Sequence, residues 1–247
     1  MGEARNILLA GGTSRLGAVL AERLVRSGDR VLVFGRDAEK GSALAARIGV
    51  RFVAGAVDAG GLELLSNDVR ETITSLDALV VFIGARLVAR LSETSDDDWD
   101  SVIDANLVAP FMVARASLSL LRDGGTIVFI GSGTALYPDM ELGAYSVAKR
   151  ALERMAHMLA METALRDIRV NVVNPGQMPE PPHTLGEQSG REVGPTPTPP
   201  LGRGAEPEDV AAAVEFLISE ASAFCTGTSV TVDGGLRSAL RAHRVRQ

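Results

Sequence analysis

The stretch that decides the fold is residues 126–152, TIVFIGSGTALYPDMELGAYSVAKRAL, which passes from a strand into a helix. Its first part, Ile127–Ile130, is a short apolar run bounded by glycines, a pattern typical of a buried strand. Its last part begins near Tyr145 and is rich in residues that favour a helix. Tyr145 and Lys149 stand four residues apart and therefore share one helix face, with Cβ atoms roughly 5–6 Å apart.

This spacing suits proton transfer. A free phenol has a pKa of about 10, and a cation within about 4–6 Å favours the phenolate. Such a group can give a proton to a carbonyl oxygen or take one from an alcohol. The chain has two tyrosines, Tyr137 and Tyr145, and two lysines, Lys40 and Lys149, so chance rarely produces this spacing. The alternative is an ordinary helical turn that carries both residue types. Ser132, thirteen residues before Tyr145, is a third candidate at the end of the predicted strand.

Length and composition indicate one well-packed domain, because 247 residues with 46% hydrophobic content suffice for a large core. No apolar run approaches the 18 or so residues of a membrane span. The first strand begins almost at once, which leaves no room for a signal peptide. Cys225 is the single cysteine, so we expect a reducing compartment, and the net charge of −6 disfavours nucleic-acid binding. We therefore expect a soluble cytoplasmic protein, and we assign no metal ligands.

Strand-like runs alternate with helical patterns along the chain. The predicted strands are 6–10, 30–34, 50–54, 77–83, 126–130, 169–173 and 229–232. The predicted helices are 15–28, 37–48, 62–74, 97–121, 145–166 and 207–219. This alternation predicts an α/β fold with a doubly wound parallel sheet covered by helices on both faces.

One segment interrupts this alternation. Residues 177–207 hold eight of the eleven prolines and show no helix or strand pattern. So long an irregular piece in a compact domain is usually functional, and we expect it to form a substrate lid. The last residues, 236–247, contain four arginines and are expected to form a solvated basic tail.

Over residues 5–235 the sequence resembles the short-chain dehydrogenase/reductase family, whose hallmark is YxxxK with a serine about thirteen residues upstream. The resemblance implies a single Rossmann-type domain, residues 1–235, that assembles into a homotetramer or a dimer. It implies that Ser132 holds the substrate carbonyl oxygen and that Tyr145 gives it a proton. Lys149 would bind the nicotinamide ribose and lower the pKa of the phenol. Asn106 would hold a water that links Lys149 to solvent.

The same resemblance indicates where the cofactor binds. Residues 10–17, AGGTSRLG, are similar to the family's TGxxxGxG, with Ala10 in place of the threonine and Arg15 in place of the middle glycine. Glycines at such a turn let a helix N-terminus approach a pyrophosphate. The cofactor contacts expected are Gly11, Thr13, Ser14, Arg15, Leu16, Gly17, Arg36, Val57, Gly84, Tyr145, Lys149, Pro175, Gly176 and Met178. The family's threonine after its Pro-Gly is replaced by Glu180.

The end of the second strand favours NADP over NAD. Members that bind NAD carry an aspartate there, whereas this chain has Gly35 followed by Arg36. A guanidinium can bind a 2′-phosphate with two hydrogen bonds, and Arg15 would add a second cation. The alternative is that Arg36 pairs with Asp37, which also suits the start of a helix.

Three other functions are weighed against a ketoreductase-like enzyme. Related enoyl reductases space tyrosine and lysine as YxxMxxxK, which would require a lysine where Leu152 stands. Extended epimerases and dehydratases have a longer C-terminal substrate domain. A non-catalytic NADP-binding regulator or scaffold of the same fold is the alternative outside enzymes, and it would be expected to lack Tyr145 or Lys149. The substrate itself stays open beyond a carbonyl or alcohol.

Overall fold

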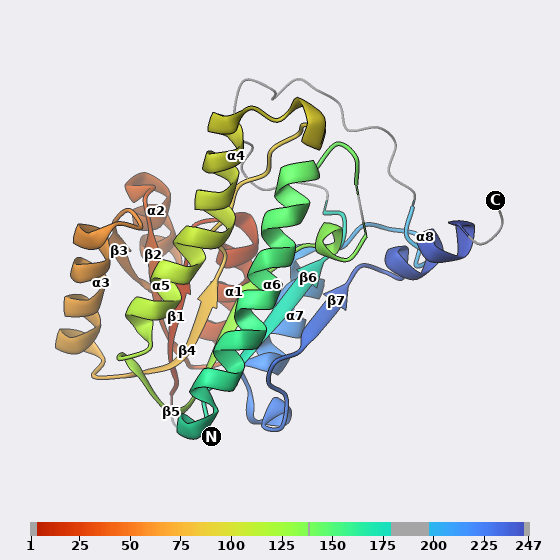
Figure 1. The fold of residues 1–247 in the computed structure, drawn as a ribbon. Coiled ribbons are helices and arrows are strands. Elements are labelled where there is room, and N and C mark those ends of the chain that lie inside the picture. The colour runs from red at the N-terminus through yellow and green to blue at the C-terminus, as the bar shows by residue number, and fades with distance from the viewer. Residues whose placement is uncertain (1–3, 138, 179–197, 245–247) are drawn as a thin grey trace.

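A computed structural model describes residues 4–137, 139–178 and 198–244. Within these ranges the strands form one parallel sheet in the order β3-β2-β1-β4-β5-β6-β7 (Figure 1). The strands are β1 (Asn6–Ala10), β2 (Arg30–Gly35), β3 (Arg51–Ala54), β4 (Leu76–Val81), β5 (Leu121–Ile130), β6 (Arg169–Pro175) and β7 (Ser229–Val232). The main helices are α1 (Arg15–Arg26), α2 (Ala38–Ile48), α3 (Ala59–Thr72), α4 (Asp96–Ile103), α5 (Ala109–Ser117), α6 (Gly143–Thr163), α7 (Pro207–Leu217) and α8 (Leu236–Arg244).

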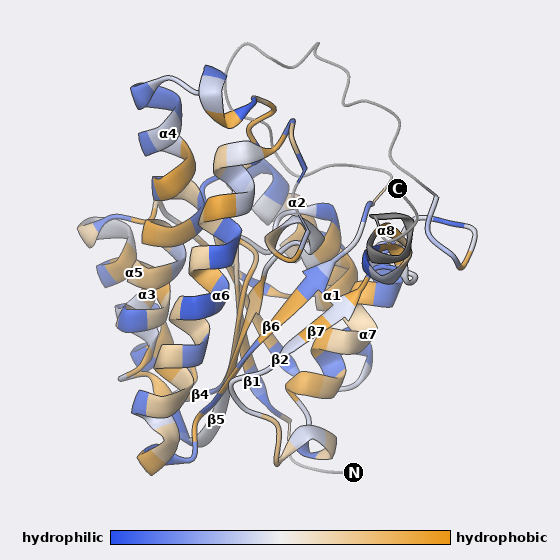
Figure 2. Ribbon diagram, turned by 45° about the vertical axis from the view of Figure 1, so that its right-hand side comes forward, coloured by the Kyte–Doolittle hydropathy of each residue, from blue (hydrophilic) through white to orange (hydrophobic). Residues whose placement is uncertain are grey.

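Helices cover both faces of the sheet, as the apolar strands require (Figure 2). On β1, Leu8 and Ala10 pack with residues of α3, α5 and α6, whereas Ile7 and Leu9 pack with α1, α2 and α7. All four side chains are fully buried. The predicted doubly wound parallel sheet is therefore confirmed. No helix in the described part is both long and apolar enough to cross a bilayer.

The single helix predicted over 97–121 is wrong. The structure divides it into α4, a π-helical turn at Asp104–Val108 and α5, and β5 already begins at Leu121. Pro110 explains where the break falls, because it has no N–H to donate to the carbonyl of Asn106, four residues earlier. The break places Asn106 in the π-helical turn.

The segment expected to be a solvated tail contains helix α8, which the sequence did not predict. The Asp233 carboxylate accepts hydrogen bonds from the Gly235 and Arg237 N–H groups (2.9 and 2.8 Å). These bonds satisfy N–H groups at the start of the helix. Leu236 is fully buried and anchors the helix to the body of the domain.

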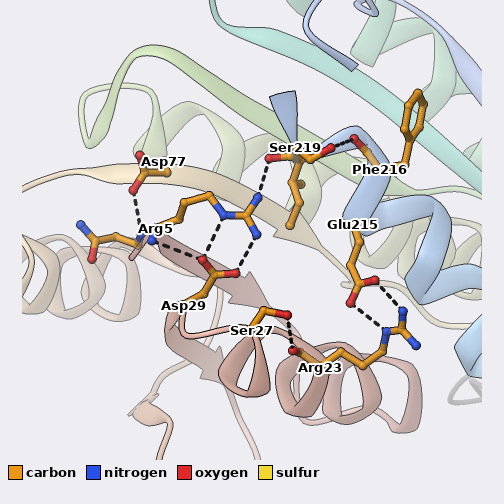
Figure 3. A network of polar contacts seen from close by, with 10 residues as sticks. Arg5, Arg23, Ser27, Asp29, Asp77, Glu215, Phe216 and Ser219 are labelled. Carbon is orange, nitrogen blue, oxygen red and sulfur yellow. Dashed lines mark hydrogen bonds and ion pairs between the residues drawn. The ribbon is translucent and has the colours of Figure 1, made fainter. Parts of the chain in front are cut away.

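The two ends of the sheet differ in character. At the amino ends of the strands, Arg5 donates to both carboxylate oxygens of Asp29 and to the Ile218 carbonyl, and Arg23 binds Glu215 (Figure 3). These contacts tie the N-terminus, α1 and α7 together. At the carboxyl ends, β1 and β4 are neighbours, but the chain continues from β1 to β2 on one side of this pair and from β4 to β5 on the other side. In open α/β sheets such a switch point forms a ligand crevice.

Candidate active site

The structure brings the four predicted catalytic residues together at the carboxyl edge of the sheet. Ser132 follows β5, Tyr145 and Lys149 lie on α6, and Asn106 lies in the turn between α4 and α5. Asn106 is fully buried, and Tyr145 and Lys149 are only 7% and 4% exposed. Polar groups this buried are costly unless they are hydrogen-bonded or used in function. The cluster is therefore the candidate active site.

The phenol of Tyr145 is held in its protonated form. Burial raises its pKa, and two weaker effects oppose this: a hydrogen bond with the Ser132 hydroxyl and the positive charge of Arg86. The sequence predicted that Lys149 would lower this pKa, but Lys149 is not among the groups that shift it here, and desolvation dominates. The Lys149 ammonium lies 5.8 Å from the centre of the Tyr145 ring. A protonated phenol is the form that can donate to a carbonyl oxygen.

Lys149 reaches from α6 to the end of β5. Its Nζ donates to the Ile130 carbonyl oxygen at 3.1 Å. Burial lowers its pKa from 10.5 to about 8. The side chain therefore titrates near neutral pH, and its charge is available at pH 7.

Gly84 makes room for both polar side chains behind the tyrosine. A Cβ atom at this position would lie 2.7 Å from Asn106 Oδ1 and 2.9 Å from Lys149 Nζ. The Asn106 amide also donates to the carbonyls of Ala85 (2.7 Å) and Val102 (2.9 Å), and its Oδ1 accepts from the Ala85 N–H. The glycine predicted as a cofactor contact thus also lets Asn106 and Lys149 approach one another.

A buried polar chain, which the sequence did not predict, supports Ser132. Asn174 Oδ1 accepts from the Ser132 N–H (3.0 Å), and Asn174 Nδ2 donates to Glu153 Oε1 (3.2 Å). Glu153 is 2% exposed and forms an ion pair with Arg150. The available signal was the position of Glu153 four residues after Lys149, on the same face of α6.

Replacing Glu153 with alanine should destabilise the fold by about 2–3 kcal/mol, because it leaves the buried amide of Asn174 without its acceptor. Glu153→Gln keeps an acceptor oxygen and should cost clearly less. Urea unfolding of the two variants measures the difference. Equal stabilities would contradict a role for the carboxylate in holding Asn174 and, through it, Ser132.

The glycine-rich turn after β1 packs closely against α1. A Cβ at Gly17 would lie 2.6 Å from Gly12 Cα, so the helix can approach the turn only without a side chain there. The Ser14 hydroxyl caps α1 by accepting from the Gly17 N–H (3.1 Å), and Leu16 is buried. The Gly11 N–H donates to the Phe34 carbonyl (2.8 Å), which joins the turn to the end of β2.

Arg36 stands exposed beside this turn. The methyl and hydroxyl of Thr13 lie next to Gly35, at 3.6 and 3.5 Å from a Cβ built there. Asp37 caps α2 by accepting from the Lys40 N–H (2.9 Å) and pairs with the Lys40 ammonium (3.2 Å). Among the described residues Arg36 forms no ion pair, so the alternative pairing with Asp37 is not seen.

Arg15, predicted as a second cation, lies at the start of α1. Its guanidinium is about half exposed, 4.0 Å from the Glu206 carboxylate. Arg15 therefore lies beside the glycine-rich turn and also close to a carboxylate at the start of α7.

The remaining predicted cofactor residues also lie at the carboxyl edge. Val57 is half-buried just before α3, and Pro175 ends β6. The Gly176 N–H donates to the Val232 carbonyl (2.8 Å), and the partly buried Met178 packs against the core. The predicted lid, 177–207, and Glu180 fall mostly outside the described residues. The two described ends of the 177–207 segment lie side by side, because the Ala205 N–H donates to the Gln177 carbonyl (2.8 Å).

Tyr137, to which the sequence assigned no role, borders the site. A Cβ at Gly133 would lie 3.0 Å from its hydroxyl oxygen. Burial and the negative charges of Asp233 and Asp139 raise the pKa of Tyr137 to about 12. A cavity of about 340 Å³ opens beside it, lined by Thr134, Ala135, Leu136, Tyr137, Ser146, Val147 and Arg150.

No three His, Cys, Asp or Glu side chains gather as metal ligands in the described ranges.

Comparisons with known proteins find relatives over nearly the whole chain. Residues 11–237 match the family model described as enoyl-(acyl carrier protein) reductase. The chain is 29% identical over 238 residues to an NADP-dependent (R)-specific alcohol dehydrogenase of Lentilactobacillus kefiri, covering 92% of this chain and 94% of that protein. It is 31% identical over 243 residues to a 2-(S)-hydroxypropyl-CoM dehydrogenase of Xanthobacter autotrophicus, covering 93% and 95%. The crystal structure of a dehydrogenase/reductase from Sinorhizobium meliloti superposes with a TM-score of 0.84 at 33% identity, covering 95% and 96%.

Proposed function

Because the chain belongs to the short-chain dehydrogenase/reductase family, we propose that it transfers hydride between NADP(H) and a carbonyl or alcohol substrate. Enzymes of this family are oxidoreductases that use a nicotinamide cofactor. The observation that carries the proposal is the buried, protonated phenol of Tyr145, which is hydrogen-bonded to Ser132 and shares a helix face with Lys149.

In the direction of reduction, Ser132 donates a hydrogen bond to the substrate carbonyl oxygen, and Tyr145 transfers its proton to that oxygen. The cofactor, when bound, supplies the hydride, while the protein supplies orientation and the proton. The Ser132 hydrogen bond and the Arg86 charge both favour the phenolate that remains. Lys149 would also bind the cofactor ribose, and Asn106 would link Lys149 to solvent through a water.

Carbonyl reduction suits the site better than enoyl reduction. Lys149 follows Tyr145 by four residues. The lysine of the enoyl reductases would stand seven residues after Tyr145, where this chain has the buried apolar Leu152. The printed names of the Lentilactobacillus and Xanthobacter relatives describe dehydrogenases of an alcohol and of a hydroxypropyl compound. Both names support a substrate with a carbonyl or hydroxyl group at the reacting carbon.

A panel of ketones, aldehydes and alcohols, followed by NADPH oxidation or NADP reduction, tests this function. We expect at least one class to be turned over. The outcome against it is tight NADPH binding with no turnover across the panel, which would favour a non-catalytic NADP-binding regulator or scaffold.

The residues around the glycine turn fit NADP. Arg36 is exposed and carries no ion pair within the described ranges, while Thr13 lies beside Gly35 at the same edge. Arg36 would hold the 2′-phosphate, with Arg15 as the second cation. The start of α1, with its close Gly17 packing, would face the pyrophosphate.

NADPH should bind at least tenfold more tightly than NADH, a difference of about 1.4 kcal/mol. Arg36→Ala should remove most of this preference and make NADPH binding less sensitive to salt, because a charge pair is lost. Calorimetry with both cofactors measures this, with Arg70→Ala, an exposed arginine on α3, as the matched control. Equal affinity of the unmodified protein for both cofactors would refute the assignment.

The proposed assembly is a homotetramer built partly by α6. Ala148 and Leu152 are buried inside the subunit, whereas Val147, Met158 and Met161 are 42%, 42% and 74% exposed on the same helix. Light scattering at micromolar concentration should report about four times the 25.9 kDa chain mass. Met158→Asp should lower this measured mass. An unmodified protein that is monomeric would contradict the proposal.

A further inference from the structure

The loop after β4, residues 85–89, is held at both ends beside the candidate active site. At one end, the Asn106 side chain donates to the Ala85 carbonyl (2.7 Å) and accepts from its N–H (3.2 Å). At the other, the Gly143 N–H donates to the Ala89 carbonyl (3.2 Å). Both anchors belong to elements that build the active site, so the backbone of this loop is positioned in advance of binding.

The loop packs directly against the predicted proton donor. Leu87 and Val88 share one buried apolar cluster with Tyr145. Arg86, just before them, carries a positive charge that acts on the Tyr145 phenol. The guanidinium therefore lies near enough for its charge to act on the group that would protonate the substrate oxygen.

Arg86 is partly buried, and its guanidinium has a hydrogen-bond donor that no protein group in the described part of the chain meets. Its Nε atom is buried without a hydrogen-bond partner, and no ion pair joins Arg86 to a residue of the described ranges. Glu141, which also approaches this loop, pairs with Arg90 (3.2 Å) instead. A buried N–H donor without an acceptor is unfavourable, so the unmet Nε of this guanidinium indicates a ligand that completes it.

We propose that Arg86 binds a carboxylate on the substrate, so that the preferred substrates are keto acids and the corresponding hydroxy acids. This rests on the proposed oxidoreductase function and specifies its substrate class. The planar fork of a guanidinium matches a carboxylate and can bind it through two hydrogen bonds. A single arginine balances a monoanion, whereas a phosphate dianion would call for a second cation beside it.

Matched acids and esters provide the test. Pyruvate, acetoacetate and levulinate are compared with their ethyl esters in NADPH-dependent reduction, with 2-oxopropylphosphonate as the phosphate-like arm. We expect at least one acid to exceed its ester in kcat/KM by about tenfold, and Arg86→Gln to remove this preference. Arg86→Lys should keep part of it. Arg90→Gln, the neighbouring exposed arginine that pairs with Glu141, should leave it intact.

Two further measurements separate recognition from a structural role. Arg86→Gln should leave the thermal midpoint unchanged or raise it, because it removes a buried N–H donor that has no acceptor. The NADPH dissociation constant should stay within about twofold of the unmodified value. A lower midpoint with equal losses on acid and ester would make Arg86 a structural residue and overturn the proposal. Loss of NADPH affinity would assign it to the cofactor, and a preference for the phosphonate would replace the carboxylate; both overturn it.

Failure of this inference is distinguishable from failure of the proposed function. If the esters are reduced as well as the acids, the enzyme function stands and the carboxylate site is refuted. If nothing is reduced, calorimetric titration of acetoacetate into the NADP-containing protein decides. Binding that Arg86→Gln abolishes supports the anion site in a non-catalytic protein, and no binding refutes the site as well.

Discussion

Tyr145→Phe is expected to lower turnover by about 10²–10⁴-fold while leaving NADPH affinity nearly unchanged. The substitution removes the proton donor, and general acid catalysis contributes on this scale. The phenyl ring keeps the packing of Tyr145 against Leu87 and Ala148. Steady-state kinetics on any accepted carbonyl substrate, with fluorescence titration of NADPH, measures both quantities.

The chain's other tyrosine provides a matched control. Tyr137→Phe also removes one partly buried hydroxyl next to the site. The negative charges of Asp233 and Asp139 disfavour the phenolate that proton donation by Tyr137 would leave, whereas Ser132 and Arg86 favour the phenolate of Tyr145. We expect its effect on turnover to be at least about tenfold smaller. Unaltered turnover in Tyr145→Phe, or equal losses in the two variants, would remove Tyr145 as the proton donor.

Lys149→Met is expected to damage both turnover and NADPH affinity, each by about tenfold or more, because Lys149 is proposed to act on the phenol and on the cofactor ribose. Turnover of the unmodified enzyme should fall as the pH rises through about 8, where Lys149 loses its charge. Variant and unmodified protein are compared by the same kinetic and titration assays. Unchanged NADPH affinity in the variant would exclude the ribose contact.

The same substitution should change how stability depends on pH. The pKa of Lys149 is about 8 in the fold and 10.5 in the unfolded chain, so between these values the unfolded chain binds the extra proton. Stability therefore rises with pH across this window, by at most about 2 kcal/mol from pH 8 to about 9.5. Lys149→Met should lack this rise in urea unfolding. Ionisation of tyrosines in the unfolded chain opposes the effect above about pH 10. An identical rise in the variant would show that another group causes it.

The fold and the central site residues were predictable because their signals are local. Apolar runs alternating with helical patterns predicted the doubly wound sheet. Tyr145 and Lys149 were recognisable because residues four apart must share a helix face, whatever surrounds the helix. The turn at Gly11–Gly17 was recognisable because a strand, a glycine-rich turn and a helix follow one another directly.

Contacts between distant segments were not predictable in the same way. The chain from Glu153 through Asn174 to Ser132 joins three elements, and no single stretch shows it. The helix starting at Leu236 depends on Asp233 and on burial of its first residue. The break at Asn106 did have a local signal, in Pro110, but its consequence lies across the domain, where the Asn106 side chain binds Ala85.

The sequence by itself therefore determined the parallel sheet and the positions of Ser132, Tyr145 and Lys149 along the chain. Only the tertiary structure decided the protonation of Tyr145 and Lys149 and the surroundings of Arg86. The repeat of a helix or a strand spans only a few residues, so the sequence alone predicts which side chains share a face. A pKa depends on how much water packing removes: burial raises that of Tyr145 and lowers that of Lys149, against the sequence-based expectation for the phenol.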